Sequence, residues 1–200
     1  MASQAGGEAT DQHVSVVILG HSYTSRLAKY MLSGDRKNFG LRNITVHFEG
    51  VGGATLRPKE HKCIWSFRQA VADHQPDIIF LHIGENDLGS LSPGDITREI
   101  MLLVNNLSTL NRHPVVILGQ LISFPATQHQ NLDSIREINA SLRNHMPAGH
   151  VFWHHRFGLS PESGNFLRDN VHLNPHGMRR YYKSLRAAIG RVYHRNHTQP

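Results

Sequence analysis

The chain has 200 residues, 39% of them hydrophobic, and a formal net charge of +6 with its 16 histidines neutral. This length fits one α/β domain with a substantial core. The longest apolar runs, such as residues 78–81, are far too short to cross a bilayer, so no membrane span is expected. The positive charge favours anionic partners, whether nucleic acid, anionic lipid or an acidic substrate, without choosing among them.

The two ends of the chain and its single cysteine indicate the domain boundaries and the cellular compartment. Residues 1–12 are small and polar and lack the basic and apolar regions of a signal peptide. We expect a disordered N-terminal tail over residues 1–12, one domain over residues 13–194, and a C-terminal tail over residues 195–200. Cys63 is the only cysteine. An intrachain disulfide is therefore impossible, which favours a reducing compartment and a cytoplasmic protein.

Short apolar, β-branched runs predict five buried strands. They cover residues 14–19, 44–48, 78–83, 115–118 and 151–153. Apolar residues at helical spacing predict five helices, over residues 23–32, 59–73, 93–110, a segment around Ile135 to Leu142, and residues 175–193. The second of these contains Cys63, which we expect to be a half-buried structural thiol. Ser92 and Pro93 mark the start of the third helix. The last helix is expected to bury Met178, Tyr182, Leu185, Ile189 and Val192.

Strands and helices alternate along the chain, with loops short enough for right-handed crossovers. This order predicts a three-layer α/β/α sandwich around a parallel sheet of five strands, in the order 2-1-3-4-5.

Polar residues and glycines gather at the positions where these strands end. Ser22 follows the first strand, Gly52 and Gly53 the second, and Asn86 the third, whereas Asp169 and His172 stand just before the last helix. Because all strands of an open parallel sheet end at one edge, where ligands bind, we expect these residues to meet there.

Acyl transfer to a serine needs this set of groups. Ser22 would attack a carbonyl, His172 would take and later return its proton, and Asp169 would orient the imidazole. The amides of Ser22 and Gly53 and the carboxamide of Asn86 would stabilise the oxyanion. Taken singly, each loop also fits an ordinary turn, with Ser22 as a helix cap. Their convergence on one edge favours the catalytic interpretation.

Together these segments resemble the SGNH (GDSL-type) hydrolases, a family named for a Ser, a Gly, an Asn and a His on separate blocks. The matching segments are Gly20-His-Ser22, Gly53-Ala-Thr55, Gly84-Glu-Asn-Asp87 and Asp169-Asn-Val-His172-Leu-Asn-Pro-His-Gly177, and the similarity extends over residues 14–192. The resemblance implies a flavodoxin-like sandwich and a serine esterase without metal or other cofactor. It assigns Ser22, Asp169 and His172 to the triad, and Ser22, Gly53 and Asn86 to the oxyanion hole.

One position departs from the family pattern. His21 stands where the family usually has an aspartate. That aspartate is not the triad carboxylate, so the triad itself is unaffected. We expect the change to alter the geometry of the loop and to lower the rate.

Two other functions compete with this one. His154, His155, His172 and His176 suggest a metal site, but Asn174 and Pro175 separate the last two, and no zinc-type spacing accompanies them.

A second alternative is an esterase-like module with weak or no activity that binds nucleic acid or another anionic partner. Basic residues on the last helix suggest it, namely Arg179, Arg180, Lys183, Arg186, Arg191 and Arg195. Similar modules occur in proteins of some retrotransposons. Basic residues near a helix C-terminus also suit a solvated face.

The substrate stays open within the hydrolase interpretation. Residues 120–131 and 156–167 are expected to wall the pocket, and Phe124, Phe157, Leu159 and Phe166 make it partly apolar. This composition suits short acyl esters. An acyl lipid, an acetylated carbohydrate and a small ester all fit, because one fold hosts many specificities.

Overall fold

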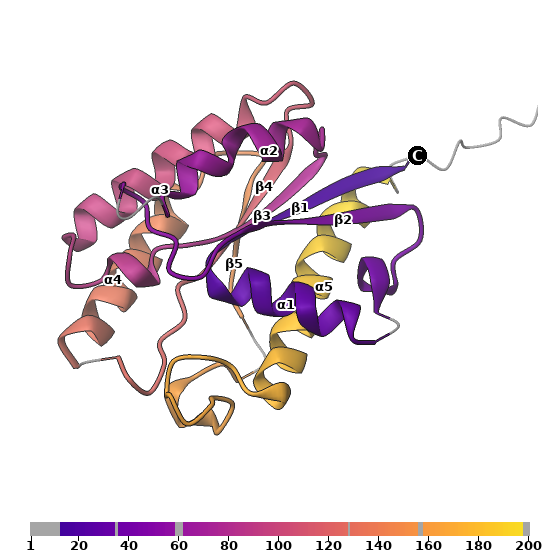
Figure 1. Ribbon diagram of the computed structural model, residues 1–200. Helices are drawn as coiled ribbons and strands as arrows, with labels where there is room; N and C mark the ends of the chain where they lie inside the picture. The colour runs from indigo at the N-terminus through magenta and orange to yellow at the C-terminus, as the bar shows by residue number, and fades with distance from the viewer. Residues whose placement is uncertain (1–12, 35, 59–61, 128, 156–157, 198–200) are drawn as a thin grey trace, which may run out of the picture.

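The computed structural model describes residues 13–34, 36–58, 62–127, 129–155 and 158–197. The expected tail over residues 1–12 lies outside these ranges. Figure 1 shows a central sheet with helices on both sides. Its strands are β1 (Val14–Gly20), β2 (Ile44–Gly50), β3 (Ile78–His82), β4 (Val115–Gly119) and β5 (Val151–Trp153). All pairings are parallel and the order is β2-β1-β3-β4-β5, as the sequence predicts.

Two helices cover one face of the sheet and three cover the other. The first pair is α1 (Ser22–Leu32) and α5 (Pro175–His197), and the second group is α2 (Arg68–Asp73), α3 (Pro93–Ser108) and α4 (His129–His145). Successive strand residues alternate between the two cores: Val16 and Ile18 pack toward α1 and α5, whereas Val17 and Leu19 pack toward α3. Burial on both faces explains why the strands are apolar throughout. The predicted three-layer sandwich is confirmed.

The second predicted helix is wrong at its start. Cys63 forms a parallel bridge with Thr55, and Ile64 N donates to Thr55 O at 2.9 Å. This extended pairing takes the backbone groups that a helix would use, so the chain turns only at η2 (Ile64–Phe67) before α2 begins. Residues 59–61 lie outside the described chain. Cys63 is half-buried, as expected, with Sγ 3.5 Å from Leu56 O.

The last helix differs from its prediction in length and in one buried residue. α5 continues to His197. Tyr181, not Tyr182, is fully buried. The Tyr181 side chain reaches the end of β3, where its hydroxyl lies 2.6 Å from His82 Nδ1, while Tyr182 stacks on Phe39 with ring centroids 5.1 Å apart. The remaining short elements are η1 (Lys37–Gly40), η3 (Glu85–Asp87) and η4 (Pro161–Ser163). Among the described residues, no helix is both long and apolar enough to cross a membrane.

Gly20, at the end of β1, allows a close approach between β1, β3 and α1. A Cβ atom there would overlap the carbonyl oxygen of His82 and would lie 2.7 Å from Oγ1 of Thr24. Gly190, inside α5, is the opposite case, since a Cβ atom would meet nothing within 4 Å outside its own helix.

We therefore expect Gly20→Ala to lower the free energy of unfolding by about 2–3 kcal/mol or more, because backbone atoms must shift. Gly190→Ala is the matched control, and it should raise the free energy of unfolding by about 0.5–1 kcal/mol through helix propensity. Chemical denaturation of the two variants measures both effects. A Gly20→Ala variant as stable as the wild type would contradict this view of the strand end.

Candidate active site

Ser22 is the first residue of α1, directly after β1. The preceding residue, His21, is the N-cap, and its Nδ1 accepts from Tyr23 N at 3.5 Å. The serine hydroxyl is therefore not used as the helix cap, contrary to the ordinary-turn interpretation. Ser22 is half-buried, and its Oγ lies 3.4 Å from His21 Nδ1. At this position the free N–H groups and the dipole of the helix favour a developing negative charge.

Asp169 and His172 form a bonded pair on the loop before α5. His172 Nδ1 lies 2.8 Å from Asp169 Oδ2, while Asp169 Oδ1 accepts from the backbone N–H groups of His172 and Val171, each at 2.9 Å. These donors hold the pKa of Asp169 below its usual range, the backbone N–H of His172 contributing most. The ionised carboxylate fixes a proton on Nδ1, which leaves Nε2 to accept one. The sequence pattern predicts this pair, and the structure contains it.

A hydrogen bond connects the same loop to the start of α1. Tyr23 donates its hydroxyl hydrogen to Val171 O at 2.9 Å, so the residue after Ser22 contacts the segment between Asp169 and His172. Tyr23 is buried, and burial is the main cause that raises its pKa, followed by the charges of Glu85 and Asp169. The structure does not pair Ser22 with His172 as the triad would. Within the described part of the chain, no hydrogen bond joins Ser22 Oγ to His172, and Ser22 Oγ faces His21 instead.

The other two candidate oxyanion residues, Gly53 and Asn86, lie on neighbouring loops. Gly53 has a φ of +80° on the exposed loop after β2, and a Cβ atom on Gly52 would lie 3.9 Å from Ser22 Cβ. Asn86, in η3, donates from Nδ2 to Ala54 O at 2.8 Å. This bond couples the loops after β2 and β3 and leaves the second hydrogen of the carboxamide available.

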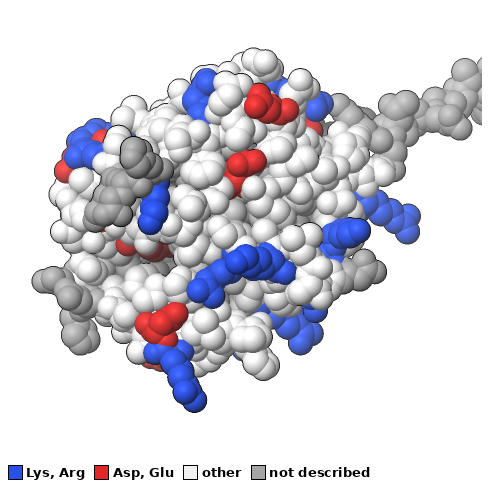
Figure 2. Space-filling model, viewed as in Figure 1, with Lys and Arg blue, Asp and Glu red and all other residues white. Residues whose placement is uncertain are grey.

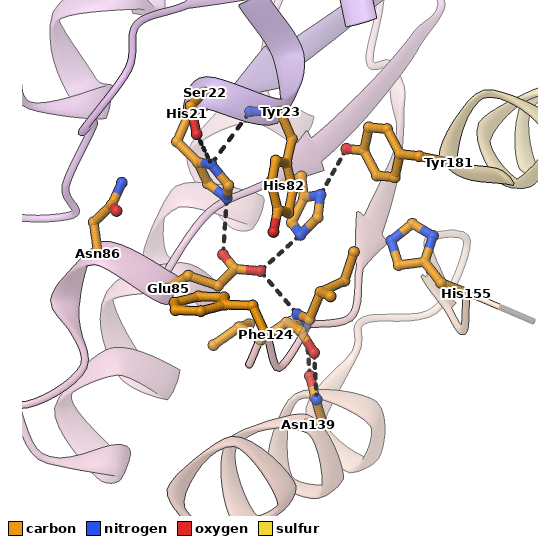
Figure 3. A network of polar contacts seen from close by, with 12 residues as sticks. His21, Ser22, Tyr23, His82, Glu85, Asn86, Phe124, Asn139, His155 and Tyr181 are labelled. Atoms are coloured by element: carbon orange, nitrogen blue, oxygen red, sulfur yellow. Dashed lines mark hydrogen bonds and ion pairs between the residues drawn. The ribbon is translucent and has the colours of Figure 1, made fainter. Parts of the chain in front are cut away.

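Sequence reasoning missed a buried polar cluster beside Ser22, made of His21, His82, Glu85 and Tyr181 (Figure 3). His21 Nε2 lies 3.0 Å from Glu85 Oε2, and His82 Nε2 lies 2.7 Å from Glu85 Oε1. Glu85 Oε1 also accepts from Ile122 N at 2.9 Å. One signal was available: His82 interrupts an apolar strand that is buried on both faces.

Glu85 is ionised within this cluster. Burial alone would raise the pKa of Glu85, but the electrostatic attraction of the His82 and His21 rings and the hydrogen bonds that both rings donate outweigh it, so the pKa lies well below its usual range. Among the described residues, His21, His82 and Glu85 are also the one group of three that could hold a metal ion. Their atoms are already satisfied by hydrogen bonds to one another and to neighbours.

The histidines singled out for a metal site are separate from this group. His155 is buried with Nδ1 2.9 Å from Ser184 Oγ, and His154 Nδ1 lies 2.7 Å from Gln120 Oε1. His172 is engaged with Asp169. The described residues do not gather these side chains with His176 into a ligand set.

The expected pocket walls are only partly at the site. Leu159 is buried and Phe166 half-buried in the core under α1 and α5, so both serve packing. Phe124 is half-buried and adjoins the buried polar cluster in Figure 3. Phe157 lies outside the described residues.

Comparison with known proteins identifies the family of the chain. Residues 11–180 match the GDSL-like Lipase/Acylhydrolase family. The chain belongs to this family, the SGNH hydrolases. Its members are carboxylic ester hydrolases. No curated protein matches the chain in sequence.

Solved structures share the fold at low identity. Est24, a carbohydrate acetylesterase from Sinorhizobium meliloti, has a TM-score of 0.67 and 16% identity over 90% of this chain and 99% of its own. A carbohydrate esterase of family 3 from Talaromyces cellulolyticus gives 0.63 and 15%, over 90% and 97%. Axe2, an acetylxylan esterase from Geobacillus stearothermophilus, gives 0.57 and 14%, over 94% and 96%.

Asp87 gives the site region a pH-dependent stability. Its two carboxylate oxygens accept from Leu56 N at 3.1 and 3.2 Å, and burial raises its pKa to about 6. A carboxyl group whose pKa is raised on folding stabilises the fold while it is protonated. That contribution is present below the unfolded value of about 3.9 and is lost as the pH rises through about 6.

Asp87→Asn should remove this loss, because the amide stays neutral and its oxygen still accepts from Leu56. The quantity to compare is the melting temperature of the variant minus that of the wild type. We expect this difference to be about 2–4 °C larger at pH 8 than at pH 4.5, which corresponds to about 1 kcal/mol in a domain of this size. Asp133→Asn on exposed α4 is the control for amide substitution. A difference that is the same at both pH values would refute the assignment to Asp87.

Proposed function

We propose that the chain is a serine esterase that hydrolyses short acyl esters, with Ser22, His172 and Asp169 as its catalytic triad. One observation carries the proposal: the bonded Asp169–His172 pair is fastened through Val171 and Tyr23 to the first turn of α1, where Ser22 lies. Family membership supports the reaction class. The tautomer set by Asp169 is the one that a general base needs.

The proposed reaction runs through an acyl-enzyme. Ser22 Oγ turns from His21 toward His172, attacks the ester carbonyl and gives its proton to His172 Nε2. His172 returns the proton to the leaving oxygen, and water then hydrolyses the acyl-enzyme by the same path in reverse. The amides of Ser22 and Gly53 and the free hydrogen of Asn86 would stabilise the oxyanion, each worth about 3 kcal/mol.

Short acyl esters are the substrate class to test first. An apolar groove of about 340 Å³ lies between α1 and the segment that follows His172, and it is lined by Leu167, Leu173 and Met178 together with Arg26 and Lys29 of α1. Two structural neighbours, Est24 and Axe2, are described as a carbohydrate acetylesterase and an acetylxylan esterase. These points support an acetylated carbohydrate or a lipid ester. A cytoplasmic location also remains a proposal, based on the single cysteine.

Ser22→Ala is the direct test. The variant should lose both ester turnover and labelling by a fluorophosphonate probe while its circular dichroism stays that of the wild type. Ser25→Ala, one turn further along α1, is the matched control and should keep both activities. Asp169→Asn should lower turnover by about 10⁴-fold through a misoriented imidazole. Labelling of Ser22→Ala at the wild-type rate would rule out Ser22 as the nucleophile.

A second candidate function is binding of RNA or another anionic chain, with or without catalysis. Arg191 and Arg195 line a hollow of about 490 Å³ along β5, with His150 and His154. Figure 2 shows further basic side chains on the face of the molecule where α1 lies. By contrast, Arg186 is engaged in the fold, since its Nε donates to Phe39 O at 2.8 Å.

If this function holds, a single-stranded RNA should bind with an affinity that falls steeply with salt. Arg191→Gln/Arg195→Gln should weaken binding and reduce the salt slope by about one for each phosphate that is no longer neutralised. Arg136→Gln is the control, because Arg136 already pairs with Asp133 at 2.8 Å. Fluorescence anisotropy at several salt concentrations measures the slope. Equal binding by both variants would exclude the β5 hollow as the RNA site.

A further inference from the structure

Ser22 stands next to a second histidine that is backed by a carboxylate. Its Oγ lies 3.4 Å from His21 Nδ1, and His21 Nε2 lies 3.0 Å from Glu85 Oε2 (Figure 3). The order is hydroxyl, imidazole, carboxylate, which is also the order of the triad proposed with His172. The two histidines differ in their surroundings, because the His21 side chain is 4% exposed and that of His172 26%.

The neighbours of His21 determine which of its ring nitrogens carries the proton. Nε2 faces the Glu85 carboxylate, which only accepts hydrogen bonds. Nδ1 faces the backbone N–H of Tyr23, which only donates. His21 therefore holds its proton on Nε2, and its single Nδ1 lone pair is shared between the Tyr23 N–H at 3.5 Å and the Ser22 hydroxyl at 3.4 Å. This is the tautomer that can take a proton from the serine hydroxyl.

The rest of the buried polar cluster can support the charge that this transfer creates. Glu85 accepts three hydrogen bonds, from His21, His82 and Ile122. His82 Nδ1 lies 2.6 Å from the Tyr181 hydroxyl, which can donate to neutral His82 or accept from its protonated form. With His82 neutral, the cluster carries one buried negative charge. A proton arriving at His21 would neutralise that charge.

We propose that His21, held by Glu85, is a second general base for Ser22. The proposal rests on the proposed function, because it requires Ser22 as the nucleophile. The 3.4 Å separation is long for a hydrogen bond, but catalytic hydrogen bonds commonly tighten only when the substrate binds. The histidine in the first family block thus supplies a base where the family's usual aspartate stands.

The proton balance of this route assigns separate tasks to the two histidines. As the bond from Oγ to the carbonyl carbon forms, the hydroxyl proton moves to His21 Nδ1. This route, unlike the one in which His172 takes the proton of Ser22, begins with His172 protonated. His172 gives that proton to the leaving oxygen as the ester bond breaks, and regains one from the water that attacks the acyl-enzyme. His21 then returns its proton to Oγ as the acyl bond breaks. The sum is ester and water going to acid and alcohol.

Fluorophosphonate labelling isolates the first of these tasks. The bond from Oγ to phosphorus forms, the phosphorus–fluorine bond breaks, and fluoride leaves with the electron pair. Because fluoride needs no proton on leaving, the reaction requires a base and no acid. A variant without His172 can therefore still be labelled if His21 serves Ser22.

The experiment compares rate constants for labelling of the full chain, read by intact mass, and peptide mass spectrometry shows which residue carries the label. We expect His172→Ala to lose ester turnover but to keep labelling at least about 10-fold above Ser22→Ala, a small part of what a general base contributes. Adding His21→Asn should remove this remainder, although the asparagine oxygen can still cap Tyr23 N. Adding His74→Asn, which breaks a histidine–glutamate pair at Glu49, is the matched control and should not.

Glu85→Gln in the His172→Ala background gives an independent variant. The new amide would donate to His21 Nε2, move the ring proton to Nδ1 and so remove the base without removing the imidazole. Labelling is measured at least 10 °C below the melting temperature of each variant, so lost stability is not mistaken for lost catalysis. If one double variant does not fold, the other decides.

Two results would overturn the proposal. One is labelling of His172→Ala that falls to the level of Ser22→Ala. The other is equal labelling of folded His172→Ala and His172→Ala/His21→Asn, which would leave His21 as a helix cap only. Failure of the proposed function has a different signature, since wild type and Ser22→Ala would then label alike.

Discussion

The buried carboxylate of Glu85 joins more parts of this structure than any other side chain described above. It accepts from His21 after β1, from His82 at the end of β3, and from the backbone of Ile122 after β4. Through His82 and Tyr181 it also reaches α5. The segments that follow β1, β3 and β4 are thus held to one another by a single charged group, in addition to the strands that precede them.

Such a group is expensive to bury, and its burial has a consequence for function. An ionised carboxylate loses several kcal/mol of solvation in the interior, which hydrogen bonds recover only when the geometry is good. Its three donors lie 2.7–3.0 Å away. Because removal of a single partner would leave a charge uncompensated, the cluster fixes His21 in one orientation. Groups with strongly shifted pKa values beside a nucleophile are a common mark of active sites.

Local patterns in the sequence were sufficient to predict the sheet and the bonded Asp169–His172 pair. Apolar runs locate all five strands, and the β–α alternation gives their order. The spacing of Asp169 and His172 on one loop is a local property, so the bonded pair was predictable. The second helix was wrong because a bridge between Thr55 and Cys63 overrides the apolar periodicity, and no local signal reveals that pairing.

The buried polar cluster could not be predicted for a related reason. His21 and Glu85 are 64 positions apart, and His82 and Tyr181 are 99 apart. Only the register of β1 against β3, which places Gly20 opposite His82, brings these residues together. The choice of Tyr181 over Tyr182 for burial follows from the same contact, since a buried hydroxyl needs a partner and His82 supplies one.

The position of Ser22 between two histidines limits how its hydroxyl can be used. A hydroxyl has one hydrogen, so it can donate to His21 or to His172 at any moment, but not to both. In this structure it faces His21, the more buried of the two histidines. The exposed Asp169–His172 pair is then free to exchange protons with solvent, leaving group and attacking water. In the proposed route through His21, burial on one side of the serine and exposure on the other therefore separate activation of the nucleophile from proton exchange with the substrate.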